Sequence, residues 1–77
     1  SMAKRTHRVK GQTMATFYSQ LASLLRSGVP MIRALTVLSQ QSTDKALSEV
    51  LVEIKGRVEE GEPLGQAMSR YPRVFSD

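Results

Sequence analysis

Apolar residues recur at intervals of three and four along most of the chain, and this spacing limits the possible folds more than any other feature. The clearest run consists of Leu47, Val50, Leu51, Ile54 and Val58. Such a spacing places the side chains on one face of an α-helix, whereas a half-buried strand alternates at every second residue. No segment alternates in that way, and no Asn-Gly or Asp-Gly pair indicates a tight hairpin. The sequence therefore predicts an all-α fold, an antiparallel helical bundle.

The first two of four predicted helices lie in the first half of the chain. One covers residues 13–27 and starts at Thr13, whose hydroxyl can cap the first turn. Its expected buried stripe consists of Met14, Phe17, Leu21, Leu24 and Leu25. The next helix runs from Pro30 to about Gln40. Together they form a helical hairpin.

The other two predicted helices follow a polar stretch. The third has its cap at Ser42 or Thr43, carries the clearest apolar stripe and ends at Gly61. The fourth starts at Pro63 and stops before Tyr71, because the residue that precedes a proline disfavours helix.

Two helix corners share one pattern, in which a glycine is followed two residues later by a proline. They are Gly28 with Pro30 and Gly61 with Pro63. Glycine ends a helix well because it adopts a positive φ without a Cβ clash. Proline suits the first turn of a helix, where its missing N–H has no partner to lose. We therefore expect positive φ at both glycines and both prolines in the first turn of the next helix.

The net charge of +4 belongs to the N-terminal segment, because bases and acids are equal in number over residues 12–77. The bases of that segment are Lys4, Arg5, Arg8 and Lys10. They are candidates for electrostatic contact with anionic lipid or with an acidic partner, although a solvated linker would have the same composition. We interpret residues 1–11 as a cloning remnant, Ser1-Met2, followed by a basic linker, and residues 12–77 as the folded part.

Length and composition set the broad class. The chain has 77 residues, enough for one small domain or part of one. It contains no cysteine, so no disulfide framework stabilises it, which is compatible with a reducing cytoplasm. No apolar stretch approaches the roughly 18–20 residues that cross a bilayer. An intracellular, non-spanning domain is expected.

Residues suited to catalysis are sparse. The single histidine, His7, lies in the basic segment, so no nucleophile has a fixed base beside it. Glu49 and Glu53 are paired at helical spacing, but they lie opposite the apolar stripe, where a solvated helix face is the ordinary interpretation. No glycine-rich loop followed by Lys-Ser or Lys-Thr is present to bind phosphate. The sequence predicts no enzyme, no cofactor and no metal.

A small basic nucleic-acid-binding helical module is the main alternative. A recognition helix needs exposed bases and amides, yet the second predicted helix offers only Arg33 and the fourth only Gln66 and Arg70. Nucleic acid is therefore not an expected partner. A fragment of a small cytoplasmic enzyme would instead need a buried ionisable cluster, which the pattern does not indicate.

Two ordered segments resemble the type II secretion system F domain. Residues 17–35 have its aromatic residue, Gln-Leu-Ala, two leucines, a small-Gly-apolar-Pro corner and an Ala-Leu pair. Residues 58–68 and 72–75 are similar to its second signature, in which a Gly-x-Ser-Leu-x-x-Ala-Leu element precedes Pro-x-Val-Phe. Pro63 replaces the serine that is usual in the family. The helix thereby loses a hydroxyl that could cap its first turn, but it gains a residue whose φ is already fixed at a helical value.

The resemblance implies a partial domain with a scaffolding role. The family domain is a six-helix bundle, of which this chain would contain the first four helices. The implied parent is a multi-pass, membrane-embedded platform protein with this domain at the cytoplasmic face of the bacterial inner membrane. Its implied partners are the secretion or pilus ATPase and other inner-membrane assembly proteins.

A homodimer is also expected, from the apolar surface of a partial bundle. Four such helices display more apolar side chains than a bundle of this size hides by itself. Val74 and Phe75 follow the expected stop at Pro72 and are predicted to be exposed there, as the centre of a self-association patch.

Overall fold

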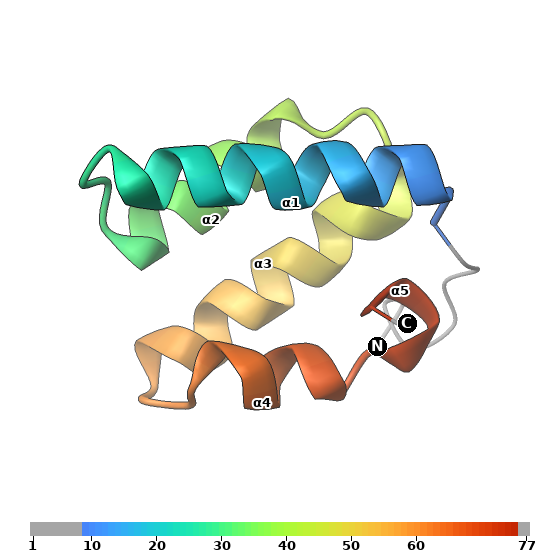
Figure 1. The fold of residues 1–77 in the computed structure, drawn as a ribbon. Coiled ribbons are helices and arrows are strands. Elements are labelled where there is room, and N and C mark those ends of the chain that lie inside the picture. The colour runs from blue at the N-terminus through green and yellow to red at the C-terminus, as the bar shows by residue number, and fades with distance from the viewer. Residues whose placement is uncertain (1–8, 76–77) are drawn as a thin grey trace.

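The computed structural model describes residues 9–75, which form five α-helices and no strand (Figure 1). The helices are α1 (Gly11–Arg26), α2 (Met31–Gln41), α3 (Lys45–Glu59), α4 (Leu64–Ser69) and α5 (Pro72–Phe75). α3 runs obliquely between α1 and α4, and α2 packs mainly against α3. The all-α prediction is confirmed, and the structure adds one short helix to the four that were predicted.

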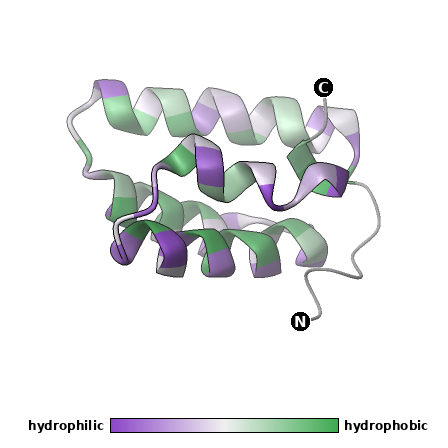
Figure 2. Cartoon of the chain, turned by 90° about the horizontal axis from the view of Figure 1, so that it is seen from below, coloured by the Kyte–Doolittle hydropathy of each residue, from purple (hydrophilic) through white to green (hydrophobic). Residues whose placement is uncertain are grey.

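The core is built around α3. Its buried side chains are Ala46, Leu47, Val50, Leu51 and Ile54, and the last three are fully inaccessible to solvent. This stripe packs with Ala34, Leu35 and Leu38 of α2 and with Met14, Phe17 and Leu21 of α1. Each of the longer helices accordingly has a hydrophobic and a hydrophilic side (Figure 2). The predicted stripe of α3 is therefore confirmed up to Ile54, while Val58 is half-buried.

The predicted cap residues of α1 and α3 are wrong by a few positions. α1 starts at Gly11, before Thr13, and no side chain caps it. Asp44 caps α3, because its Oδ1 accepts a hydrogen bond of 3.0 Å from the backbone N–H of Leu47. Ser42 instead forms a local turn in which its hydroxyl accepts from the N–H of Asp44 at 3.2 Å. A carboxylate outcompetes the neighbouring hydroxyls at this site because it also complements the helix dipole.

Both helix corners have the same geometry. Gly28 has a φ of 91° and Gly61 a φ of 102°, so the predicted positive values are confirmed. At the first corner the N–H of Val29 donates to the carbonyl of Leu24 at 3.0 Å, and the N–H of Gly28 donates to Leu25 at 3.1 Å. This pair of bonds is the Schellman motif, which satisfies the last carbonyls of a helix.

The prolines lie one residue earlier than predicted. Pro30 and Pro63 are the N-cap residues of α2 and α4, with ψ values of 148° and 145°. In this extended conformation the carbonyl of Pro30 accepts the first helical hydrogen bond, from the N–H of Ala34 at 2.9 Å. The carbonyl of Pro63 does the same for Ala67 at 3.0 Å. Each proline thus starts its helix without entering the first turn.

Substitution of Gly28 tests the corner geometry. Alanine at Gly28 is expected to lower the free energy of unfolding by about 1 kcal/mol, because an L-residue is strained at positive φ. The matched control is Gly56 inside α3, where an added Cβ meets no atom within 4 Å. Alanine there is expected to stabilise by about 0.4–1 kcal/mol, because glycine disfavours helix. Urea denaturation measures both effects, and a Gly28→Ala variant as stable as the parent would contradict the corner.

The C-terminal segment differs from the prediction. The chain does not trail off after Pro72 but forms α5, in which the carbonyl of Tyr71 accepts from Val74 and Phe75 at 3.0 Å each. Val74 is 4% exposed, and the ring centroid of Phe75 lies 6.1 Å from that of Phe17. The expectation that Val74 and Phe75 are exposed is wrong, because Pro72 starts a new helical turn that directs them into the core.

The N-terminal boundary also lies earlier than residue 12. Val9 is 3% exposed and belongs to the core cluster. Lys10 is exposed and immediately precedes α1. Lys4, Arg5 and Arg8 lie outside the described residues.

Candidate functional site

The described part of the chain, residues 9–75, contains no group of three His, Cys, Asp or Glu side chains that could hold a metal ion. Over the same residues, no helix is long and apolar enough to cross a membrane. The candidate functional features are therefore a polar network, a groove and an exposed helix face.

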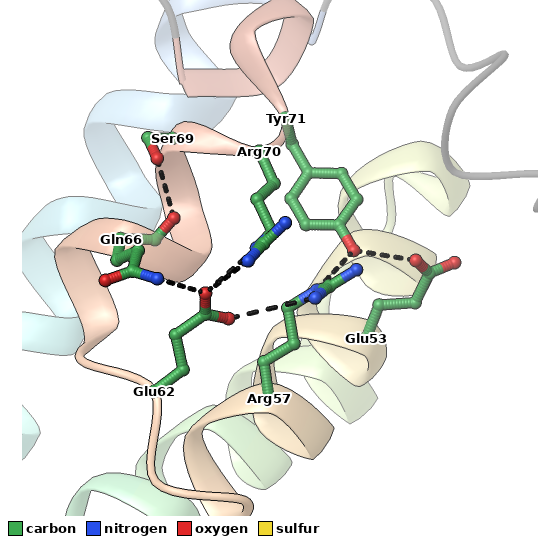
Figure 3. Close-up of polar contacts among 7 residues, drawn as sticks. All are labelled: Glu53, Arg57, Glu62, Gln66, Ser69, Arg70 and Tyr71. Atoms are coloured by element: carbon green, nitrogen blue, oxygen red, sulfur yellow. Dashed lines mark hydrogen bonds and ion pairs between the residues drawn. The ribbon is translucent and has the colours of Figure 1, made fainter.

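The polar network has Glu62 at its centre, in the corner between α3 and α4 (Figure 3). Its Oε2 accepts hydrogen bonds from Arg70 Nε at 2.9 Å and from Gln66 Nε2 at 2.8 Å. Its Oε1 lies 3.8 Å from Arg57 Nη1. One carboxylate thus joins α3 to the middle of α4 and to the residue that follows α4.

Tyr71 extends the same network to the other side of Arg57 (Figure 3). Its hydroxyl donates to Glu53 Oε1 at 2.7 Å and accepts from Arg57 Nε at 3.4 Å. The side chain is 5% exposed, so its ring belongs to the core while its hydroxyl reaches the polar edge. The network fixes the segment between α4 and α5 onto α3.

The pKa values of two groups in this network depart from their ordinary values. The hydrogen bond from Arg70 is the main cause that lowers the pKa of Glu62 below its ordinary value. A general acid at neutral pH needs a carboxyl whose pKa is raised instead. Burial is the main cause that raises the pKa of Tyr71. Both shifts lead away from neutral pH, and the hydrogen bonds and ion pair of the network link α3 to the segments that follow it.

The raised pKa of Tyr71 predicts a loss of stability in alkali. A group whose folded pKa exceeds its unfolded value stabilises fully below the unfolded value, about 10 for tyrosine, and this contribution is lost as the pH rises through the folded pKa. We expect the free energy of unfolding to fall more steeply above pH 10 in the parent chain than in Tyr71→Phe. Tyr18→Phe, at an exposed tyrosine, is the control. Equal slopes for the parent and Tyr71→Phe in urea denaturation between pH 8 and 11 would contradict the prediction.

A groove of about 430 Å³ lies between the N-terminal half of α1 and the segment that joins α2 to α3. Buried side chains from three helices contribute to its lining, Phe17, Leu38 and Leu47. The other lining residues are Lys10, Gln12, Thr13, Thr16, Gln20, Gln41, Ser42 and Thr43. Among the described lining residues only Lys10 carries a charge, so the groove offers amides and hydroxyls around apolar side chains.

The opposite flank of α1 carries exposed apolar side chains. Tyr18 is 43% exposed and Leu25 is 36% exposed, and Ala15 and Ala22 lie exposed beside them. The prediction that Leu25 belongs to the buried stripe is wrong, and this exposed face was not predicted. The sequence does contain a signal for this face. The four residues repeat the three-four spacing of the buried stripe, and each lies one position after a residue of that stripe.

Comparisons with known proteins agree on one family. Residues 17–77 match the family model of the type II secretion system (T2SS), protein F. The chain is 30% identical over 69 residues to the type IV pilus assembly protein PilC of Myxococcus xanthus, which covers 90% of this chain and 16% of the relative. It is 33% identical over 64 residues to the type II secretion system protein F of Vibrio cholerae, covering 83% and 16%.

A third relative extends the same picture. The chain is 38% identical over 61 residues to the type 4 fimbrial assembly protein PilC of Pseudomonas putida, covering 79% of the chain and 15% of the relative. The chain thus spans about one sixth of the length of the curated relatives that it matches. No solved structure matches the chain.

Proposed function

The chain belongs to the family of the type II secretion system protein F, and we propose that it is a non-catalytic scaffold domain of a platform protein in type II secretion or type IV pilus assembly. The observation that carries the proposal is the match over residues 17–77, which includes both Gly-x-Pro corners and the polar network. The relatives are named after both systems, so the proposal extends to both.

The described surface supports a role in protein binding. Arg57, Glu62 and Arg70 at the α3–α4 corner are paired within the network. The groove and the outer face of α1 offer uncharged contact area. The nucleic-acid alternative loses one of its few candidate bases, because Arg70 is bound to Glu62. We propose that the partners are the cytoplasmic assembly ATPase and other inner-membrane assembly proteins, and that the domain lies at the cytoplasmic face of the inner membrane.

The test of this function is direct binding to an assembly ATPase. Calorimetry of the purified chain with the ATPase of a secretion or pilus system is expected to show saturable binding. Thr16→Arg places a long charge in the groove and is expected to weaken that binding by about tenfold or more, which corresponds to about 1.4 kcal/mol. Ser23→Arg, also on α1 and exposed but outside the groove lining, is the matched control. No binding by the parent chain would overturn the ATPase proposal, and equal weakening by both variants would overturn the role of the groove.

The basic N-terminal segment is proposed to hold the domain near anionic lipid. Each base near such a surface contributes about 1 kcal/mol of attraction, which salt reduces. We expect a variant with glutamine at Lys4, Arg5, Arg8 and Lys10 to lose binding to vesicles that contain phosphatidylglycerol. The matched control places glutamine at four exposed bases elsewhere in the chain, Arg26, Arg33, Lys45 and Arg73. The two variants therefore lose the same number of positive charges. Co-sedimentation measures both, and equal loss in the two variants would contradict a special role of the segment.

A further inference from the structure

Polar side chains line the groove beside α1, and the fold itself does not use most of them. Six of them form no side-chain hydrogen bond with a described residue, namely Gln12, Thr13, Thr16, Gln20, Gln41 and Thr43. Thr36 on α2, by contrast, donates to the carbonyl of Ile32 at 2.9 Å, as helical hydroxyls often do. The hydrogen-bonding groups of the six side chains are therefore available to a ligand.

Three buried side chains form an apolar floor among these polar groups, Phe17, Leu38 and Leu47. They come from α1, α2 and α3, so the core holds the floor in place. A small apolar centre within a polar rim is typical of protein–protein interfaces. Small-molecule pockets are instead lined mostly by hydrophobic and aromatic side chains. The composition of the groove therefore favours a segment of a protein as its occupant.

The groove has a positive end and no acidic residue in its described lining. Lys10 is exposed, and its ammonium forms no ion pair with another described residue. α1 begins directly after Lys10 and has neither a side-chain cap nor an acidic residue in its first turn, so its dipole adds to the positive charge there. The N-terminus of α3, in contrast, is already capped by Asp44. A carboxylate is therefore complementary to the Lys10 end of the groove.

We propose, on the basis of the scaffold function proposed above, that the groove binds a short extended segment of a partner protein, with an acidic side chain of that segment at Lys10 and an apolar side chain on the floor. Glutamine carries both a donor and an acceptor, so Gln12, Gln20 and Gln41 can pair with the N–H and C=O groups of a main chain. An extended segment leaves those groups free, whereas a helix uses them internally.

The groove runs along α1, because its lining residues on that helix recur at intervals of three and four from Gln12 to Gln20. Lys10 and Phe17 are seven positions apart, which corresponds to about 10 Å along a helix axis. An extended chain spans that distance in about three residues. The acidic and the apolar residue of the bound segment are therefore expected about three positions apart.

Selection from a library of displayed random heptapeptides tests this chemistry, with the immobilised chain as bait. The parent chain is expected to enrich peptides that have aspartate or glutamate about three positions from an apolar residue. Lys10→Glu is expected to enrich lysine or arginine in place of the acid, and the new carboxylate complements the start of α1, so the fold is kept. Arg33→Glu, an equal charge change at an exposed residue outside the lining, is the matched control and is expected to enrich the same peptides as the parent.

Three results of the selection would overturn the proposal. They are no enriched peptide with the parent chain, enriched peptides that lack an acid, and the same peptides from the parent and Lys10→Glu. Circular dichroism verifies that both variants keep the helix content of the parent.

The peptide most enriched by the parent chain then measures the role of Lys10. Lys10→Gln is expected to weaken its binding by about threefold to fivefold, as for one exposed ion pair, whereas Arg33→Gln is expected to leave it unchanged. The amide NMR signals of Thr16, Gln20 and Gln41 are expected to shift when the peptide is added. A Lys10→Gln variant that keeps the affinity for the peptide but loses binding to phosphatidylglycerol vesicles would assign Lys10 to a lipid surface and overturn the proposal.

Competition with the assembly ATPase separates this inference from the proposed function. The selected peptide is expected to displace the ATPase from the chain. If the peptide binds as expected and the ATPase does not bind at all, the chemistry of the groove stands and the ATPase is the wrong partner. If the ATPase binds and the peptide does not displace it, the scaffold function stands and the groove is not the site that the partner uses, which would overturn the inference.

Discussion

Replacing Ile54 with alanine is expected to lower the free energy of unfolding by about 2–5 kcal/mol. Ile54 is fully buried at the centre of α3, where its side chain contacts the core on which the other helices pack. A domain of this size rarely has more than about 3–5 kcal/mol of stability from its core. We therefore expect Ile54→Ala to be largely unfolded at 25 °C, as measured by the circular dichroism of its helices.

Val52→Ala on the same helix is the matched control. Val52 is 58% exposed, so its truncation removes little buried area and exchanges a β-branched residue for a better helix former. The expected change in the free energy of unfolding lies within about 0.5 kcal/mol. An Ile54→Ala variant as stable as Val52→Ala would show that the core does not depend on α3.

The features that sequence predicted well are those that depend on local physics. The three-four spacing of α3 fixes which face is buried, whatever that face packs against. The glycines at the two corners are equally local, because no other residue adopts a φ near 100° as easily. The exact start of each helix was less predictable, because Ser42, Thr43 and Asp44 all compete for one cap.

The features that sequence missed depend on distant partners. Glu53 and Tyr71 are 18 residues apart, and nothing in their local sequences indicates that their side chains meet. Leu25 was assigned to the core because it continues an apolar run, but it lies to one side of the buried stripe of α1 and is 36% exposed. Burial at such positions is decided by tertiary packing.

The candidate functional features could also be predicted from the sequence only in part. The groove combines α1 with the segment around Ser42, and these parts of the chain are brought together only by the fold. The family, by contrast, was recognisable from two ordered motifs, and the match over residues 17–77 confirms it. Sequence thus identified the family, while the groove and the exposed face of α1 could be found only in the structure.

Replacing Val74 with aspartate distinguishes the structure from the expectation that the C-terminal residues are exposed. Val74 is 4% exposed within the core cluster, so a carboxylate there would lose its hydration without a partner. A cost of about 3 kcal/mol or more is expected, comparable to the whole stability of the domain. The variant is expected to unfold at much lower urea concentration than the parent.

Arg73→Asp is the control, because Arg73 is the exposed neighbour of Val74 on α5 and receives the same new side chain. It is expected to change the free energy of unfolding by no more than about 0.5 kcal/mol, as for other exposed positions. If Val74 were part of an exposed self-association patch, Val74→Asp would fold as stably as Arg73→Asp and would only dissociate dimers. Urea denaturation measures the stability of both variants, and sedimentation measures their association. If Val74→Asp is less stable and its association is unchanged, α5 closes the core over Phe17.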